Sequence, residues 1–424
     1  MPKLNPRLKH TIIFLLILGL VLPAVFLFVP EKIQEAKAAE WDVTKLGTAF
    51  EFEGATATYN SSSKIDDTHF INFWAGSDND GYVQVFTVDS GTGAVTAEGT
   101  ALEFDTVQAI FNSCAKIDDT HFINFWAGNG GGGFAQVFTV DTDTWAVTKE
   151  GTAFKFDTYG VYNSCAKIDA NHFINFWRGS SPSWHGFAQV FTVDTSTWAV
   201  TKEGTALDFS DPVYINGNNC CQIDDTHFIN FWVDSSNYGW TQVFTIDLNT
   251  WAVTAEGAAF KFESVYARAF GSCAKVNNNH VINFWGGKDS DGYTQIFTID
   301  LDTWAVTAEG TALEFDTSFG DWHFCHQIDT SHFINFWGGT DLDGFAQVFT
   351  VDTGTWAVTK EGTALEFDTA DGRYNSGAQV DANHFINFWY GSGGHGYTQV
   401  FEVEYTLPND PPNTPTNILS LIHI

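Results

Sequence analysis

The hexapeptide His172-Phe-Ile-Asn-Phe-Trp177 decides the fold of this chain, because it returns, whole or with one residue changed, seven times. Successive copies in the 424-residue sequence begin 51 to 55 residues apart. Repetition at a fixed period is typical of architectures in which each unit packs on the next. Seven β-rich units of this length predict an all-β fold, a seven-bladed β-propeller with four antiparallel strands in each blade. The copies begin at His69, His121, His172, His227, His280, His332 and His384.

The third repeat shows the expected plan of a blade. Residues 163–169 alternate small and larger side chains, as suits an inner strand crowded near the axis. Residues 172–179 and 186–194 are rich in Val, Thr and aromatic residues and predict the second and third strands. Residues 198–209 predict the outer strand, with a bulge at Gly204.

The two ends of the repeat region predict how the ring closes. Residues 41–52 match an outer strand, whereas the last repeat stops after its third strand at residues 399–403. The N-terminal strand is therefore expected to complete the last blade, which pairs strand edges that would otherwise be bare. These matches place the propeller at residues 39–407.

The segments outside the repeats predict an exported protein. Residues 1–38 have a basic start, an apolar stretch over residues 11–29 and the pattern Ala36-Lys37-Ala38, as in a signal peptide. The apolar stretch would also suit an uncleaved anchor, and either form places the propeller outside the cell or on its surface. Residues 408–424 predict a proline-rich linker. Residues 419–424 resemble a translated sequencing adapter, so we expect a truncation and a monomeric propeller within a longer chain.

The charge of the chain narrows its partners. It has 19 Lys and Arg against 51 Asp and Glu, a net charge of −32. Five of those basic residues and only two of the acidic ones lie in residues 1–38, so cleavage would leave a still more acidic propeller. Such a field disfavours nucleic acid and anionic membrane surfaces, and we expect neither as a partner beyond the N-terminal signal or anchor. Calcium or a cationic partner remains an alternative to simple solubility.

Polar residues at repeated positions are expected to be structural. The seven histidines would splay around a wide circle and could not converge on one metal ion. We expect each to hydrogen-bond to the preceding turn residue, as His172 would to Asp169. Asn175 and Gln189 have counterparts in every repeat. Because buried amides need partners, we expect contacts between these asparagines and glutamines.

The cysteines leave three interpretations open. Five of them share one inner-strand position, where a free cysteine packs as a small apolar residue. Export would permit a disulfide between neighbouring inner strands, such as Cys114–Cys165. A thiolate metal site is the third alternative. The residues are Cys114, Cys165, Cys220 with the adjacent Cys221, Cys273 and Cys325.

The repeat resembles those of uncharacterised secreted seven-bladed propeller proteins of prokaryotes. The resemblance is carried by Lys167-Ile-Asp-Ala-Asn-His172 and Phe191-Thr-Val-Asp-Thr-Ser-Thr-Trp198, covers residues 41–405, and implies the fold but no activity. The architecture is distantly similar to that of kelch proteins and sialidases. Thr350-Val-Asp-Thr-Gly-Thr-Trp356 is similar to the sialidase Asp-box but one residue shorter; the diglycine signature of kelch proteins does not recur through the repeats, and no repeat has the Trp-Asp ending of WD40 repeats.

Three loops between second and third strands carry an Asp-x-Asp-Gly pattern. Two carboxylates before a glycine match part of a calcium loop, although a full cage needs about six to eight oxygens. Asp-Gly is also a common hairpin turn. Calcium is the one cofactor that the sequence suggests, and a simple turn is the alternative. The aspartates are Asp78 and Asp80, Asp289 and Asp291, and Asp341 and Asp343.

The loops that differ between repeats are the best place to look for function. Loops between second and third strands emerge on the same face of a propeller as the blade connectors. This face would hold three tryptophans outside the repeat pattern and every arginine after residue 38. Exposed aromatic residues with polar neighbours suit stacking on sugars or anchoring a protein. The candidate ligand-binding residues are Arg178, Trp184, His185, Tyr238, Trp240, Arg268, Trp322, His323 and Arg373.

These observations favour a secreted or cell-surface, non-catalytic binding module for a glycan or a protein. A structural surface or adhesin repeat is one alternative. A sialidase-like glycoside hydrolase or lyase is another, in which the three arginines would clamp a carboxylate. We expect no enzyme activity, because the sequence contains no catalytic or cofactor motif.

Overall fold

The computed structural model describes residues 40–179, 184–210 and 213–406. Residues Trp41–Tyr405 form one compact unit. The predicted signal peptide (1–38) and linker (408–424) lie outside the described residues. Within the described ranges, no helix is long and apolar enough to cross a membrane.

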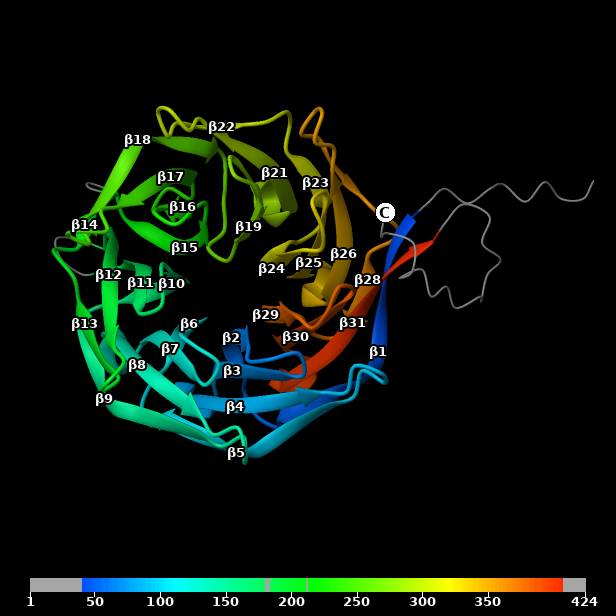
Figure 1. The fold of residues 1–424 in the computed structure, drawn as a ribbon. Helices are drawn as coiled ribbons and strands as arrows, with labels where there is room; N and C mark the ends of the chain where they lie inside the picture. The colour runs from blue at the N-terminus through cyan, green and yellow to red at the C-terminus, as the bar shows by residue number, and fades with distance from the viewer. Residues whose placement is uncertain (1–39, 180–183, 211–212, 407–424) are drawn as a thin grey trace, which may run out of the picture. The chain divides into compact units, whose positions relative to one another are not determined.

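Seven antiparallel sheets form a ring, which confirms the seven-bladed propeller (Figure 1). In blade 3, β10 (Val161–Lys167) is the inner strand, followed outward by β11 (His172–Arg178) and β12 (Gly186–Asp194). The outer strand is split into β13 (Ala199–Lys202) and β14 (Leu207–Asp208), which both pair with β12.

The other blades repeat this order. Their inner strands are β2 (Thr58–Lys64), β6 (Ile110–Lys116), β15 (Ile215–Gln222), β19 (Ser272–Asn277), β24 (Asp321–Gln327) and β29 (Arg373–Gln379). Their second strands are β3 (His69–Ala75), β7 (His121–Ala127), β16 (His227–Asp234), β20 (His280–Gly286), β25 (His332–Gly338) and β30 (His384–Tyr390). Their third strands are β4 (Gly81–Val88), β8 (Gly133–Val140), β17 (Gly239–Ile246), β21 (Gly292–Ile299), β26 (Gly344–Val351) and β31 (Gly396–Thr406).

The outer strands of these blades differ in continuity. Blades 1, 2 and 4 have β5 (Val95–Asp105), β9 (Val147–Asp157) and β18 (Val253–Glu263). Blades 5 and 6 have the split strands β22 (Val306–Ala308) with β23 (Leu313–Asp316), and β27 (Val358–Lys360) with β28 (Leu365–Asp368). Short 3-10 turns precede several third strands, namely η1 (Ser77–Asn79), η2 (Asn129–Gly131), η3 (Lys288–Ser290), η4 (Thr340–Leu342) and η5 (Ser392–Gly394).

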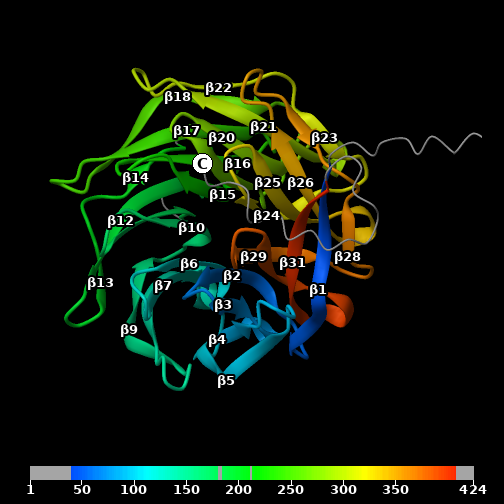
Figure 2. The same ribbon diagram turned by 45° about the vertical axis from the view of Figure 1, so that its right-hand side comes forward.

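The N-terminal strand closes the ring, as the sequence predicts. Strand β1 (Glu40–Glu53) pairs with β31 and supplies the outer strand of blade 7 (Figures 1 and 2). Trp41 of β1 packs against His332 of blade 6, with ring centroids 4.5 Å apart and the ring planes tilted by 39°. At the seam between blades 7 and 1, Gly93 replaces the tryptophan of the other outer strands, and Leu46 of β1 fills the space beside it.

Aromatic side chains pack between neighbouring blades to form the core. Phe125 and Phe156 of blade 2 and Phe191 of blade 3 are buried and make edge-to-face contacts at 5.0 to 6.0 Å. Such contacts stabilise a core beyond the area that they bury. Because similar clusters join the other blades, each blade depends on its neighbours for a complete core.

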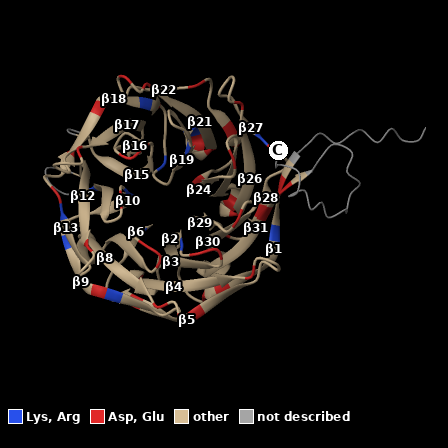
Figure 3. Cartoon of the chain, in the orientation of Figure 1, with Lys and Arg blue, Asp and Glu red and all other residues tan. Residues whose placement is uncertain are grey.

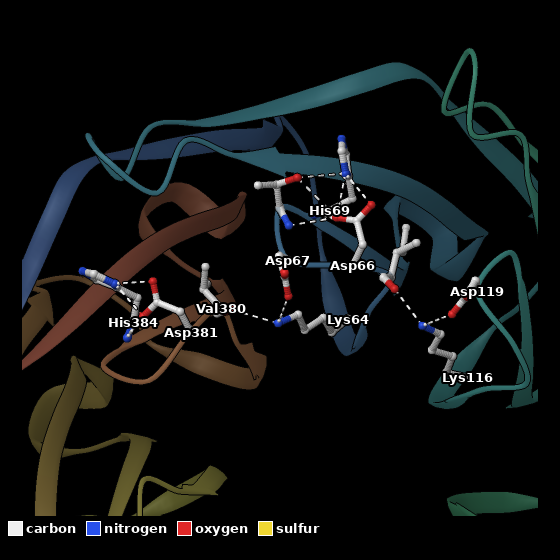
Figure 4. A network of polar contacts seen from close by, with 11 residues as sticks. Lys64, Asp66, Asp67, His69, Lys116, Asp119, Val380, Asp381 and His384 are labelled. Carbon is white, nitrogen blue, oxygen red and sulfur yellow. Dashed lines mark hydrogen bonds and ion pairs between the residues drawn. The ribbon is translucent and has the colours of Figure 1, made fainter. Parts of the chain in front are cut away.

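The repeated histidines hold turns, as predicted. His172 Nδ1 lies 2.8 Å from Asp169, and His280 uses Asn277 where the other blades have aspartate. Each of five histidines also stacks on a tryptophan of an outer-strand segment in another blade, as His172 does on Trp251 at 3.6 Å. Figure 4 shows the turns of His69 and His384, and Lys64 reaching from blade 1 to the carbonyl of Val380 in blade 7.

The predicted Asn–Gln contacts are wrong, although Asn175 and Gln189 lie opposite one another in register. Asn175 donates inward to Asn163 Oδ1 on the inner strand at 3.0 Å. Gln189 donates outward to the carbonyls of Glu203 and Gly204, both at 3.0 Å. The reason is the predicted outer-strand bulge at Gly204 (φ 57°), whose carbonyls leave the strand ladder and accept from the glutamine instead.

Candidate functional site

Six aromatic side chains gather around the propeller axis, one from the inner edge of each blade except blade 4. We call them the axial aromatic ring: Tyr59, Phe111, Tyr162, Phe270, Trp322 and Tyr374. Neighbouring members have ring centroids 4.3 to 6.2 Å apart. Blade 4 has Gly217 at this position, where a Cβ would collide with Ala269. Five of these residues lie on the inner strands, which surround the centre in Figure 1, and Phe270 lies just before the inner strand β19.

The backbone presents these aromatic residues in an unusual conformation. Five of the six have positive φ values of 53° to 56°, and Phe270 is the exception. The register of the inner and second strands shifts at the same point, for example between Val161 and Ser164. An aromatic residue in the left-handed region costs on the order of 1–3 kcal/mol, and such strain persists where the surrounding packing enforces it.

The ring borders a pocket of about 130 Å³. Besides the ring, its lining consists of asparagines, small residues and His323, without Asp, Glu, Lys or Arg. The asparagines also tie the blades together. Asn112 Nδ2, for example, donates to the carbonyl of Tyr59 in the preceding blade at 3.3 Å and its Oδ1 accepts from Asn124 at 3.0 Å. Acidic residues lie instead along outer strands such as β5, β9 and β18 (Figure 3).

The two loop-face histidines are buried rather than exposed, contrary to the sequence interpretation. His323 is 6% exposed and takes the place of the inner-strand asparagine, with its Nδ1 3.3 Å from Asn335 Nδ2. Burial lowers the pKa of His323 to about 3, so its imidazole is neutral. His185 is 3% exposed and pairs with Asp208 at 2.7 Å, because Asp208 lies opposite Phe187 in the pairing of β14 with β12, next to the start of the third strand.

Two of the three predicted arginines meet at Trp322. The guanidinium groups of Arg268 and Arg373 lie 5.9 and 5.4 Å from its ring centre. Arg268 forms an ion pair with the buried Asp321, and Arg373 forms a bidentate pair with Asp371 at 2.6 and 2.7 Å. Burial raises the pKa of Asp321 to about 6, although the attraction of Arg268 opposes the shift. Both guanidinium groups are therefore already matched by carboxylates of this chain.

The third arginine, Arg178, lies in an aromatic cage. Its guanidinium group is 4.9 Å from Tyr162, 5.2 Å from Trp184 and 5.6 Å from Tyr159. It also donates to the Tyr159 hydroxyl and to Asn216 Oδ1. Trp184 is 41% exposed, so this cage reaches from the axial ring, through Tyr162, to the surface of the loop face.

The predicted aromatic pair of blade 4 is also engaged within the chain. Lys261 lies over both Tyr238 (3.8 Å) and Trp240 (4.6 Å), in cation–π geometry. Trp240 Nε1 donates to Asp234 at 2.8 Å. One face of each ring is therefore covered by the lysine.

The candidate calcium loops form 3-10 turns, and the segment that connects to the next blade hydrogen-bonds to the turn. In blade 5, Asp289 is in the left-handed region at φ 60°, and the carbonyl of Ser290 accepts from Gly320. Asp291 shares a hydrogen bond with Glu314. The pKa of Asp291 is raised mainly by desolvation and, to a smaller extent, by the neighbouring Glu314 carboxyl group. Asp343 has the same relation to another outer-strand glutamate. Among the described residues, no group of three or more His, Cys, Asp or Glu side chains has metal-binding geometry.

The six cysteines, all within the described residues, are thiols. They pack between inner strands, where Cys165 Sγ donates to the carbonyl of Ser113 and its backbone N–H donates to Ser113 Oγ at 2.9 Å. Burial raises the pKa of Cys114 to about 12, which keeps that thiol protonated and unreactive.

The axial ring is the feature that the sequence interpretation missed. Its signal is an aromatic residue directly before the Asn-Ser segment, as in Tyr162-Asn163-Ser164. Trp322 alone of the six ring members is among the predicted site residues, because an aromatic residue that recurs at one position of most repeats is typical of the scaffold. Of the predicted site residues, only Trp322 and His323 line the pocket, and Arg178, Arg268 and Arg373 lie over ring members or their neighbours.

No protein-family model matches the chain, and no curated protein sequence matches it. Solved structures do match. A lectin from Burkholderia pseudomallei has a TM-score of 0.59 at 11% identity, covering 85% of this chain and 99% of the lectin. A 6-phosphogluconolactonase-like protein from Bacteroides fragilis has a TM-score of 0.56 at 12% identity, covering 79% and 96%. The periplasmic gluconolactonase of Pseudomonas aeruginosa has a TM-score of 0.51 at 13% identity, covering 87% and 100%. Similarity at this level supports the propeller fold alone.

Proposed function

We propose that this protein is a non-catalytic binding module, secreted or displayed on the cell surface, that holds a neutral sugar in its axial pocket. The sugar is free or forms the end of a glycan. The lining of the pocket carries the proposal: aromatic rings surround the space, and no side chain of fixed charge borders it. Aromatic faces stack on the apolar faces of sugar rings, and an uncharged wall suits an uncharged ligand.

The size of the pocket limits what enters. A volume of about 130 Å³ is several times the share of one water molecule, about 30 Å³, and close to the roughly 150 Å³ of a cavity that holds benzene. One six-membered ring is therefore the largest unit that fits. A longer glycan would place its next units on the loop face, where Arg178 and Trp184 extend the aromatic surface from Tyr162.

The two alternative functions have less support from the geometry. A clamp for an acidic sugar would need uncommitted guanidinium groups, whereas Arg268 and Arg373 are paired with Asp321 and Asp371. A purely structural adhesin repeat would not need a strained aromatic ring around an axial pocket. The similarity to a lectin structure is compatible with sugar binding, and the similarity to two lactonase structures keeps an enzymatic test worthwhile.

A glycan array probed with the full chain, once with calcium and once with chelator, tests the proposal. We expect neutral sugars to bind equally in both conditions, followed by calorimetric titration of the best monosaccharide. Loss of binding with chelator would instead implicate the loops around Asp291 and Asp343. Binding of no sugar in either condition would refute the proposal.

A matched pair of variants tests whether the axial ring is the site. Phe111→Gly copies the residue that blade 4 already has and removes a left-handed aromatic residue. It is expected to weaken monosaccharide binding about tenfold, since about 1.4 kcal/mol of lost stacking is a factor of ten. Trp198→Gly relieves the same backbone strain (φ 57°) on the outer strand and should leave affinity unchanged.

A further inference from the structure

The axial pocket has one irregular wall, at blade 5. In five blades the second-strand asparagine donates its Nδ2 to an inner-strand asparagine at 2.8 to 3.0 Å, as Asn72 does to Asn60. In blade 6 His323 takes the place of the acceptor. In blade 5 the acceptor position is Gly271, which has no side chain. Asn283 is fully buried there, and among the described residues neither its Nδ2 nor its Oδ1 has a hydrogen-bond partner.

The register shows where the Asn283 amide points. Asn283 lies opposite Cys273, just as Asn72 lies opposite Ser62, so its amide faces the position two residues earlier on the inner strand. That position is Gly271, which borders the pocket. Without that side chain the Asn283 amide lacks the acceptor found in the other blades, and the Asn219 side chain occupies the space beside Gly271, so both amides adjoin this residue of the pocket lining.

Two further polar groups on this side of the pocket also lack partners within the described chain. Asn219 has an unsatisfied Oδ1, and its Nδ2 lies 2.7 Å from the point where a Gly271 Cβ would be. The indole Nε1 of Trp322, a member of the axial ring, is buried without an acceptor. The Oδ1 of the second-strand asparagine is unpaired in every blade, so what distinguishes this wall is the unpaired Nδ2 of Asn283 beside the Asn219 Oδ1 and the Trp322 N–H. Because buried polar groups are almost always paired, these three groups indicate a missing polar occupant.

We propose that Asn283 and Asn219 form a hydroxyl-binding subsite of the axial pocket, which reads the hydroxyl groups of a neutral sugar. The inference rests on the proposed function and adds how the sugar is recognised. A sugar hydroxyl is both donor and acceptor, so adjacent hydroxyls complement the Nδ2 and Oδ1 atoms of one amide. The sugar ring would lie against Phe270 and Trp322, and the Trp322 N–H would donate to a further oxygen.

The test compares Asn283→Leu with the control Asn72→Leu by calorimetric titration with the best neutral monosaccharide of the array. Asn283→Leu is expected to weaken binding at least tenfold, because the amide that pairs with the hydroxyl is gone. Asn72→Leu should keep the wild-type affinity. A deoxy analogue lacking the recognised hydroxyl should bind the wild type weakly, and should bind Asn283→Leu no worse than the parent sugar does.

Thermal unfolding without sugar supplies the second readout. Asn283→Leu is expected to lower the melting temperature less than Asn72→Leu, because only Asn72 loses a hydrogen bond within the protein. Equal sugar affinity of wild type and Asn283→Leu would overturn the subsite and show that only water pairs with the amide. Binding of no sugar by the wild type would overturn the proposed function as well, so the two failures are distinguishable.

Discussion

Acidification is expected to destabilise the propeller through one histidine. His323 is buried and neutral, with its pKa lowered to about 3, whereas an unfolded histidine titrates near 6.5. A base whose pKa is lowered by folding keeps its full contribution to stability above the unfolded pKa. That contribution is lost as the pH falls from 6.5 towards 3, because the unfolded chain takes up the proton first.

The size of the effect follows from the two pKa values. At about pH 4.5 the unfolded histidine is almost fully protonated and the folded one almost fully neutral, a difference worth about 2–3 kcal/mol of unfolding free energy. Asp321 on the same strand acts in the opposite direction. Its pKa is raised to about 6, so its protonation favours the folded state as the pH falls from 6 to 3.8.

A comparison with His323→Asn isolates the histidine. Asparagine is the residue of most other blades at this position and does not titrate, so the acidic groups should contribute equally to both proteins. Urea unfolding followed by tryptophan fluorescence would be measured between about pH 7 and pH 4.5. We expect the stability difference to shift by about 2–3 kcal/mol in favour of His323→Asn at the acidic end. Parallel stability curves over this range would refute the assignment of a buried, neutral His323.

Three more predictions concern the outer strand of blade 5, the seam between blades 7 and 1, and the loop face. Glu314→Lys, which copies the lysine of blades 2 and 4, should stabilise the protein by about 0.2–1 kcal/mol at neutral pH, by calorimetry, because it replaces a repulsion with Asp291 by an ion pair. In the wild type, folding raises the pKa of Asp291 above 3.8, so the Asp291–Glu314 pair should contribute less stability as the pH rises above that value. A stability difference between wild type and Glu314→Lys that does not change with pH would contradict this. Gly93→Ala should cost about 1–3 kcal/mol more than Gly99→Ala, because both glycines have φ near +60° but only Gly93 would collide with β1; equal melting temperatures would contradict this. Trp184→Ala should lower affinity for longer glycans but not for monosaccharides, and an equal loss for both would place Trp184 within the pocket's own contacts.

Much of the fold was accessible from the repeat itself. The hexapeptide at His172 and its six counterparts predicted the blades, the Gly204 bulge and the ring closure by residues 41–52, and the structure confirms them. The histidine–aspartate turns were predictable because both residues lie three positions apart, within one turn. The hydrogen-bond partners of the glutamines and asparagines were not predictable. Asn175 and Gln189 lie opposite one another in register, but Asn175 donates to an amide on the inner strand and Gln189 donates to a backbone carbonyl of the outer strand.

The candidate site was much less predictable. Exposure on the loop face was expected for His185 and His323, yet both are buried, because the first pairs with Asp208 and the second replaces a core asparagine. The orphan amide of Asn283 is visible only when its contacts are compared with those of the other blades. The sequence shows that Gly271 stands where most repeats have asparagine, but it does not show that this glycine leaves the Asn283 amide without a partner.

By itself, the sequence determined the number of blades, the order of strands within them and the strand that closes the ring, because these follow from local periodicity and from pairing between neighbouring segments. Only the tertiary structure decided that six aromatic residues from six different repeats meet on one axis and border a pocket. The physical reason is ring closure. Each inner strand approaches the axis only when all seven blades are in place, so the pocket belongs to the closed ring and to no single repeat.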